Sequence, residues 1–285
     1  MSFTRLTIFY FVFFISSTSN VVGQSMSYDL WYGLSMYQGD IKSESLPSFK
    51  SSAAVGFGIT YSFDQKLSLV ANFKKSKISA DDKGSSDPLR RERNLNFTSH
   101  ISELSLSLRR TLFVNQSRII NPYIDLGLAL FHFNPYTFDR TGIKHFLKPL
   151  GTEGQGTNSY SDRKSYSLIQ FSIPLEIGIY IKINNLICIT YNFGWRKTFT
   201  DYLDDISKTY ADPNALIKKG PKTLELAFRG NEINPSLPYP STSFPRGNSK
   251  NMDGYFFSGL GMAFQLPKNR QGYKKENSQM NCPSF

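Results

Sequence analysis

A long alternation of apolar and polar residues constrains this chain more than any other feature. Every odd position from 169 to 183 is apolar, whereas the even positions carry glycine, proline, or polar and charged side chains. Alternate residues of a strand point to opposite faces, so this run predicts a strand with one continuous apolar face. Asn184 and Asn185 follow, and both residue types tolerate the positive φ of a tight hairpin turn. The return run from Ile187 to Phe193 alternates again.

The length and the polar face of these two runs indicate a pair of membrane-spanning strands. Strands in soluble domains usually run ~5 to 6 residues, whereas a tilted strand needs ~9 to 11 residues to cross a bilayer. The polar face of the first run carries Glu176, Lys182 and small residues, which suits the filled, polar lumen of a small barrel. The hairpin therefore predicts a transmembrane β-barrel.

Further alternating runs bring the expected number of strands to eight, and they lie near 28–37, 54–63, 67–73, 95–108, 124–130 and 255–266. Short connections alternate with long ones: the short ones are centred on Asp64, Asn115 and Asn184, and the long ones follow Tyr37, Ser79, Phe133 and Lys197. This alternation predicts an all-β fold, namely an eight-stranded antiparallel transmembrane β-barrel with long extracellular loops and short periplasmic turns. A soluble lipocalin also has eight strands, but its apolar face points inward.

Local features of these runs predict a β-bulge and an aromatic girdle. The fourth run has Leu95 and Phe97 in odd phase but is apolar in even phase from Leu104 onward, which a β-bulge near 100–103 would produce. A short helix is expected near 214–219, inside the longest loop. Aromatic residues near expected strand ends suggest interfacial girdles, and these are Trp31, Tyr61, Tyr191 and Trp195.

The N-terminus reads as an export signal. Arg5 precedes a short apolar run from 6 to 15, and small residues follow, with Val21 and Gly23 placed for cleavage before Gln24. The apolar run is shorter than the ~20 residues that a membrane-spanning helix needs. We therefore expect a signal peptide at 1–23, a barrel at 24–266, a polar periplasmic tail at 267–285, and location in the outer membrane.

The net charge of +11 does not identify a nucleic-acid-binding protein. An exported protein does not meet nucleic acid, and the basic residues are scattered rather than striped along one element. Outer-membrane lipid, including anionic headgroups, is the expected partner. Cys188 and Cys282 are compatible with a disulfide in an oxidising compartment, but two widely spaced cysteines do not imply one.

Charged residues on the polar faces of the strands are predicted to fill the lumen. An eight-stranded barrel leaves room only for side chains, so these charges predict a salt-bridged plug rather than a pore. The expected lumen charges are Glu103, Arg109, Asp125, Glu176, Lys182 and Arg196.

Catalytic and metal-binding residues are not expected. His100 and His132 fall near extracellular strand ends, where a lipid-modifying enzyme could hold its base, but no serine stands out as a nucleophile beside them or beside His145. An acidic cluster in the longest loop could supply oxygen ligands for Ca²⁺, but its spacing is not that of an EF-hand. Acidic residues that begin a turn or cap a helix explain the cluster equally well. The sequence therefore predicts no catalytic site, metal or cofactor.

Several short phrases along the chain resemble one family, the small outer-membrane barrels that include PorG, a component of the type IX secretion machinery. The phrases span nearly the whole mature chain, and the most specific is Thr200–Ser207, whose motif residues are Asp201, Tyr202, Asp204 and Asp205. The others are Tyr37–Asp40, Arg93–Phe97, Asn121–Tyr123, Phe133–Pro135, Arg229–Asn231 and Asp253–Tyr255.

This resemblance implies an eight-stranded outer-membrane barrel that contacts periplasmic ring proteins of the secretion apparatus. The short turns and the basic tail after Lys268 would make those contacts. The family also contains paralogues of other roles, so two alternatives stay open. One is a surface-binding barrel that acts through the loop at 198–253, and the other is a lipid-modifying enzyme.

Overall fold

The computed structural model describes residues 25–41, 51–113 and 119–266. The expected signal peptide at 1–23 and the expected tail at 267–285, which holds Cys282, lie outside the described residues. So does most of the short connection centred on Asn115.

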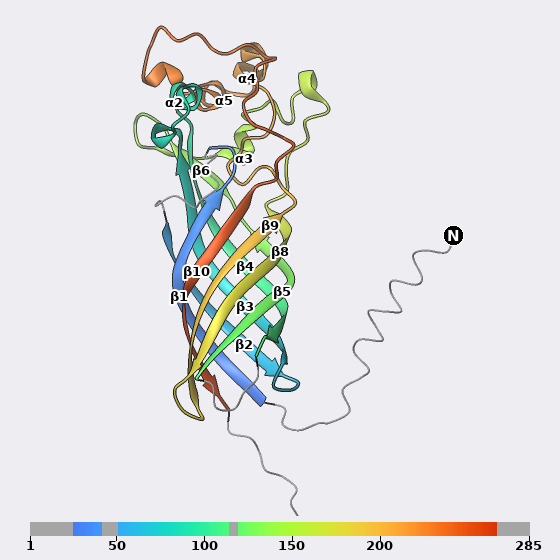
Figure 1. The fold of residues 1–285 in the computed structure, drawn as a ribbon. Helices are drawn as coiled ribbons and strands as arrows, with labels where there is room; N and C mark the ends of the chain where they lie inside the picture. Colours follow the sequence, from blue (N-terminus) through green and yellow to red (C-terminus); the bar gives the residue numbers. More distant parts are fainter. Residues whose placement is uncertain (1–24, 42–50, 114–118, 267–285) are drawn as a thin grey trace, which may run out of the picture.

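Eight long strands form a closed antiparallel barrel (Figure 1). They follow the order β3-β2-β1-β10-β9-β8-β5-β4, and pairing of β3 with β4 closes the sheet. This confirms the predicted fold class. The strands are β1 (Ser25–Gln38), β2 (Ser52–Ser62), β3 (Leu67–Asp81), β4 (Asn96–Thr111), β5 (Ile120–His132), β8 (Ile169–Lys182), β9 (Ile187–Thr198) and β10 (Gly254–Gln265).

The outer wall of the barrel is apolar because alternate residues of every strand face outward. The side chains of Phe171 and Leu128 are 63% and 66% exposed, and those of Leu104 and Leu260 are 58% and 60% exposed. Their neighbours in sequence point into the barrel and are buried or polar. An apolar exterior around a polar, filled interior is the pattern of an outer-membrane barrel.

The predicted β-bulge near 100–103 is wrong. The register between β3 and β4 is constant from the pair Leu67–Arg110 to the pair Asp81–Asn96, so the strand has no break in phase. Phe97 and Ile101 point into the barrel, where they are 2% and 1% exposed. The apparent change of phase arises because the upper lumen is apolar, so that inward-facing positions there carry apolar residues.

The prediction that Trp31 belongs to an interfacial aromatic girdle is wrong. Its side chain lies inside the barrel, 8% exposed, and its Nε1 donates a hydrogen bond to Asn192 Oδ1 at 2.9 Å. Two glycines make room for the indole: a Cβ atom on Gly33 or Gly259 would lie 2.7 or 2.6 Å from the ring. Tyr191, by contrast, is exposed on the outer wall.

The helices of the described residues lie at the end of the barrel where the long connections are, and together they form a cap over its mouth (Figure 1). The predicted short helix near 214–219 is confirmed as α4, which begins with Pro213 and is capped by the Asp212 side chain.

Within the described residues, no helix is long and apolar enough to cross a membrane. The cap elements are η1 (Asp82–Gly84), α2 (Pro88–Arg93), β6 (Pro135–Phe138), β7 (Lys144–Phe146), α3 (Leu147–Leu150), η2 (Asn158–Tyr160), α4 (Pro213–Lys219), α5 (Pro221–Ala227) and η3 (Gly230–Glu232).

The β6–β7 hairpin extends the barrel wall upward. β6 pairs with β4 at Thr98 and Ser99, above the end of β5, and β7 pairs with β6. The hairpin therefore continues the outer surface of β4 and β5 beyond the barrel proper.

Candidate functional site

A buried ionic network crosses the lumen. Arg196 on β9 is fully buried, and its Nη2 lies 3.1 Å from Glu103 Oε1 on β4 while it also contacts Glu176 on β8. Lys74 on β3 places its Nζ 3.0 Å from Glu176 Oε1. Two acidic and two basic side chains therefore neutralise one another in the middle of the barrel.

Neutral and aromatic groups add further hydrogen bonds to the carboxylates of the lumen. Tyr255 donates to Glu103 Oε2 at 2.6 Å, and Asn192 donates through Nδ2 to Glu176 Oε2 at 2.9 Å. Nearer the end opposite the cap, a separate pair joins Arg109 to Asp125 through two hydrogen bonds of 2.9 and 2.8 Å. Buried charges persist in a protein only when they are paired and hydrogen-bonded, and this lumen meets that requirement.

Five of the six expected lumen charges lie inside the barrel: Glu103, Asp125, Glu176 and Arg196 are buried, and the Arg109 side chain is 13% exposed. Lys182 shares their face of the strand but is the last residue of β8, where it is exposed. Sequence reasoning missed Lys74 because the apolar alternation of β3 ends at Phe73. Lys74, Lys75 and Lys77 follow without that alternation, although the strand continues to Asp81.

The mouth of the barrel is closed by the loop between β9 and β10. Leu203 and Ile206, within the Thr200–Ser207 phrase, are 0% and 1% exposed. They join a buried apolar cluster with side chains of the upper lumen, including Phe97 and Phe131. The phrase that carried the family resemblance is therefore the segment that seals the lumen from above.

Two carboxyl groups of this loop meet at the Tyr37 hydroxyl. Asp204 Oδ2 lies 2.7 Å from Tyr37 Oη, and Asp253 Oδ1 lies 3.0 Å from the same atom. Asp253 also accepts from the Leu203 amide, and Asp204 from the Ile206 amide. Both acids therefore fix the loop to the end of β1 and to its own backbone.

Of the other motif residues, Asp201 and Asp205 are buried and Tyr202 is partly buried. Asp205, at a φ of 67°, accepts from the Thr152 and Tyr166 hydroxyls at 2.5 and 2.8 Å. The ring of Tyr202 stacks on Tyr166 with centroids 4.8 Å apart. Asp201 is 5% exposed. The described part of the chain has no group of three metal-ligating side chains placed to hold a metal ion.

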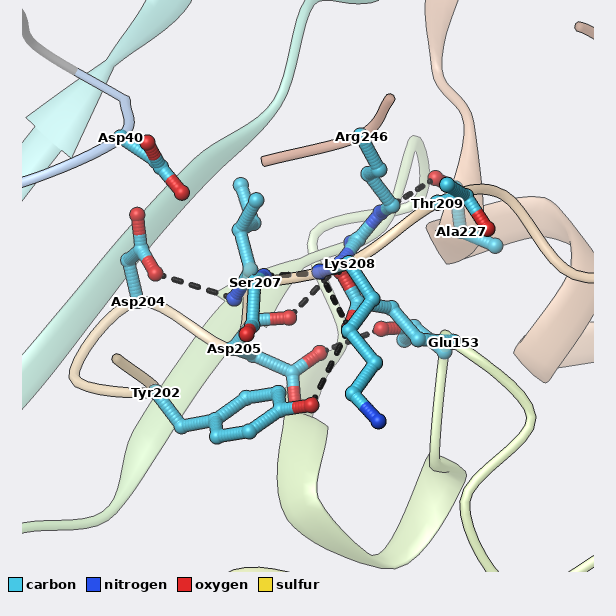
Figure 2. A network of polar contacts seen from close by, with 12 residues as sticks. Asp40, Glu153, Tyr202, Asp204, Asp205, Ser207, Lys208, Thr209, Ala227 and Arg246 are labelled. Atoms are coloured by element: carbon cyan, nitrogen blue, oxygen red, sulfur yellow. Dashed lines mark hydrogen bonds and ion pairs between the residues drawn. The ribbon is translucent and has the colours of Figure 1, made fainter. Parts of the chain in front are cut away.

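Glu153 and Arg246 lie at the centre of a second network, in the cap (Figure 2). Their side chains approach to 3.2 Å, and both are almost fully buried. Glu153 Oε1 also accepts from the Ser207 and Lys208 amides at 2.9 and 3.1 Å. Arg246 donates to the Asp205 carbonyl through Nη1 at 2.7 Å, and to the Ala227 carbonyl through Nε. The pair thus joins residue 153 to three stretches of the β9–β10 loop, at 205–208, 227 and 246.

Burial shifts three acids of the Thr200–Ser207 segment toward their protonated forms. Burial raises the pKa of Asp204 to about 8, and the nearby Asp40 carboxyl contributes to that rise. Burial raises the pKa of Asp201 to about 8 and that of Asp205 to about 6. The folded cap therefore holds protons that the unfolded chain releases.

We expect the cap to lose stability as the pH rises. An unfolded aspartate has a pKa of ~3.9, so the folded state binds the extra protons between about pH 4 and pH 8. The stabilisation that these protons give is complete below about pH 4 and is lost as the pH rises to about 8. Hydrogen-exchange protection factors for residues 200–210 should fall from pH 5 to pH 8, and Asp204→Asn should flatten the change. Protection that is constant or rises with pH would contradict this expectation.

The cap also contains a hollow of about 420 Å³ between α2 and the segment 237–248. Its walls include Tyr210, Phe228 and Phe244, together with Arg90 and Arg93 from α2. Asp40, Asp87 and Glu92 also line it, so the hollow combines aromatic walls with charges of both signs, on the side of the barrel where the long loops lie.

The three histidines take no part in either network. His100 and His132 face outward from β4 and β5 and are exposed, and the ring of His100 stacks on Tyr136 with centroids 6.0 Å apart. His145, on β7, places its Nε2 2.9 Å from Asp139 Oδ2.

Comparison with curated proteins finds no match. Among solved structures, the chain is similar to Ail, the attachment invasion locus protein of Yersinia pestis, at 8% identity and a TM-score of 0.41, over 86% of this chain and 100% of that one. It is similar to Neisserial surface protein A at 9% identity and a TM-score of 0.42, with the same coverage. A major outer membrane protein from Thermus thermophilus gives 10% identity and a TM-score of 0.39, over 85% of this chain and 99% of that one.

One protein family matches the sequence directly. Residues 6–218, more than half of the chain, match the family described as a domain of unknown function, DUF6089. The match runs from the apolar N-terminal segment through the Thr200–Ser207 phrase and most of α4. The chain belongs to the DUF6089 family.

Proposed function

We propose that this protein is a non-conducting, non-enzymatic barrel of the outer membrane that serves as a structural part of a larger assembly. The observation that carries the proposal is the closure of the lumen. A charge-balanced network fills its middle, and Leu203 and Ile206 seal its mouth. Such a barrel offers a rigid, membrane-embedded body rather than a path for solutes. Export through the signal peptide at 1–23 and insertion into the outer membrane belong to the same proposal.

The assembly we propose is the type IX secretion apparatus, because the sequence phrases resemble barrels that include PorG. Contact with periplasmic ring proteins would be made by the short turns and by the tail after Lys268. The turns suit this role because side chains hold them rigidly. Asn184 Oδ1 accepts from the amides of Leu186 and Ile187, each at 2.8 Å. Asp64 Oδ1 does the same for Lys66 and Leu67 at the β2–β3 turn.

Site-specific crosslinking in the native membrane tests the secretion role. A photoreactive residue at Gln65, exposed in the β2–β3 turn, should crosslink to periplasmic ring proteins that mass spectrometry identifies after pull-down. The matched control is the same group at Ser236, exposed in the cap, which should not. Recovery of only lipid and general porins from Gln65 would rule out the secretion role and leave the barrel unaffected.

We expect no stepwise ion conductance from the purified protein in planar bilayers, because side chains from opposite walls meet across its lumen. A large trimeric porin inserted into the same membrane provides the positive control. Stable unitary steps from the wild-type protein would show that the lumen is open and would contradict the proposed role.

A second candidate function is binding at the cell surface, which the hollow between α2 and segment 237–248 favours. Its aromatic walls suit a ligand with an apolar body, and its charges of both signs suit polar groups on that ligand. Replacing Phe244 with serine should remove such binding without affecting the barrel. A difference in gel migration between unheated and heated protein would show that the barrel is still folded.

A further inference from the structure

On β3, β4 and β5, the outer wall changes from apolar to basic side chains between one outward-facing row of residues and the next. Phe73 pairs with Leu104, and Leu104 pairs with Leu130, so these strands share an exposed apolar row. The next outward-facing row toward the cap places Lys75 opposite Ser102 and Ser102 opposite His132.

One row further, Lys77 pairs with His100. We call Lys75, Lys77, His100, Ser102 and His132 the wall patch. Lys75, Lys77 and both histidines are exposed. The wall patch therefore begins where the apolar row ends.

The wall patch gathers its hydrogen-bond donors around Ser102. Side chains opposite one another on paired strands lie about 4.5–5.5 Å apart at Cβ, and diagonal neighbours about 7–8 Å apart. Lys75 and His132 are the direct neighbours of Ser102 on either side, and His100 is two residues before it on the same strand and face. Two ammonium groups, a hydroxyl and two imidazoles can thus reach one small anionic group.

The described residues do not neutralise the charge of the wall patch. No ion pair between described residues involves Lys75 or Lys77. On the outward faces of β3, β4 and β5 the described acid is Asp81, which is four positions beyond Lys77 toward the cap.

The cap adds a further cation beside the wall patch. Lys144 places its Nζ 3.7 Å from the centroid of the Tyr136 ring, and that ring stacks on His100. The strands across the barrel differ, since β9 and β10 present Trp195 and Phe256 at this end. Lys197 of β9 also faces outward one row closer to the cap, so basic side chains are concentrated on the side of β3, β4 and β5 but are not restricted to it.

We propose that the wall patch binds the headgroup phosphate of an anionic lipid in the outer leaflet. The apolar row of Phe73, Leu104 and Leu130 would hold the acyl chains below it. A phosphate is a strong acceptor for several charged and neutral donors at once, and lysines near a membrane surface attract anionic headgroups. A lipid is favoured over a soluble anion because the donors adjoin the membrane-facing apolar row. This inference is independent of the secretion role.

Lipid retention measured by native mass spectrometry tests the proposal. The full chain would be refolded into nanodiscs of phosphatidylcholine with a minor fraction of phosphatidic acid, and the lipids that remain bound after release would be counted. The wild type should retain phosphatidic acid selectively. The variant K75S/K77S should retain about tenfold less, because each lysine near the surface contributes a severalfold factor. H100Q/H132Q serves as a second variant that leaves both lysines in place and should also retain less.

The matched control is R110S. Arg110 faces outward from the same strand as Ser102, is exposed, and lies at the opposite edge of the apolar belt. Its loss should leave retention unchanged. Equal retention by the wild type and K75S/K77S, or an equal loss in R110S, would overturn the proposal. So would lysine-dependent binding of inorganic phosphate by the lipid-free protein in detergent, since that result would identify a site for a soluble anion.

Discussion

Replacing Arg196 with methionine should lower the free energy of unfolding of the barrel by about 3–5 kcal/mol, the range for breaking a buried ion pair. Arg196 is fully buried between Glu103 and Glu176. Without its guanidinium group, Glu103 keeps the Tyr255 hydroxyl but loses its cation, and Lys74 alone must balance two carboxylates. Equilibrium unfolding in urea, followed by tryptophan fluorescence in lipid vesicles, measures the change.

The matched control for this experiment is Lys182→Met, because Lys182 shares the lumen-facing phase of β8 but is exposed at its end. It should change stability by less than about 0.5 kcal/mol. Glu176→Ala should be destabilising like Arg196→Met, since it leaves Lys74 buried without its carboxylate. If Arg196→Met and Lys182→Met were equally stable, the lumen network would not hold the barrel together.

Replacing Arg246 with methionine should open the cap and leave the barrel folded. Arg246 joins Glu153 to the backbone at Asp205 and Ala227, and all of these groups are buried. Loss of the Arg246 side chain should lower the free energy of opening the cap by about 3 kcal/mol. The population of the open cap then rises by about two orders of magnitude. Cleavage within residues 199–253 by an added protease should become faster by that factor.

Arg140→Met is the control for the cap experiment. Arg140 belongs to the same region but is 53% exposed, and its pair with Glu232 is 3.7 Å long. Exposed pairs contribute little, so cleavage should keep its wild-type rate. A cap that resists protease equally in all three proteins would contradict the central role of Arg246. If unheated and heated Arg246→Met protein migrated alike on a gel, the cap and the barrel would unfold as one unit.

The barrel could be predicted from sequence because each strand carries its own evidence. The alternation in β8 and β9 fixes which residues face lipid, and it fixes the inward position of Glu176 without any knowledge of its partners. The errors arose where the two faces of a strand do not differ in polarity. Phe97 faces an apolar upper lumen, and Trp31 faces the space beside two glycines.

The cap could not be predicted because its contacts are non-local. Glu153 and Arg246 are 93 residues apart, and neither belongs to a periodic pattern. The motif acids suggested a turn, a helix cap or a metal site, and their local spacing cannot show that Asp204 would meet the Tyr37 hydroxyl. Their partners lie on β1 and in the preceding loop, which only the closed barrel brings together.

Cysteine accessibility on intact cells tests most directly whether this protein is an outer-membrane barrel with its cap outside. In a background with Cys188 and Cys282 replaced by serine, Ser236→Cys and Gln65→Cys place thiols at exposed positions at opposite ends of the barrel. A membrane-impermeant maleimide should label the first in intact cells, and the second only after the outer membrane is permeabilised. Labelling of Gln65→Cys but not Ser236→Cys in intact cells would reverse the orientation, and labelling of neither would contradict the location of the cap at the cell surface.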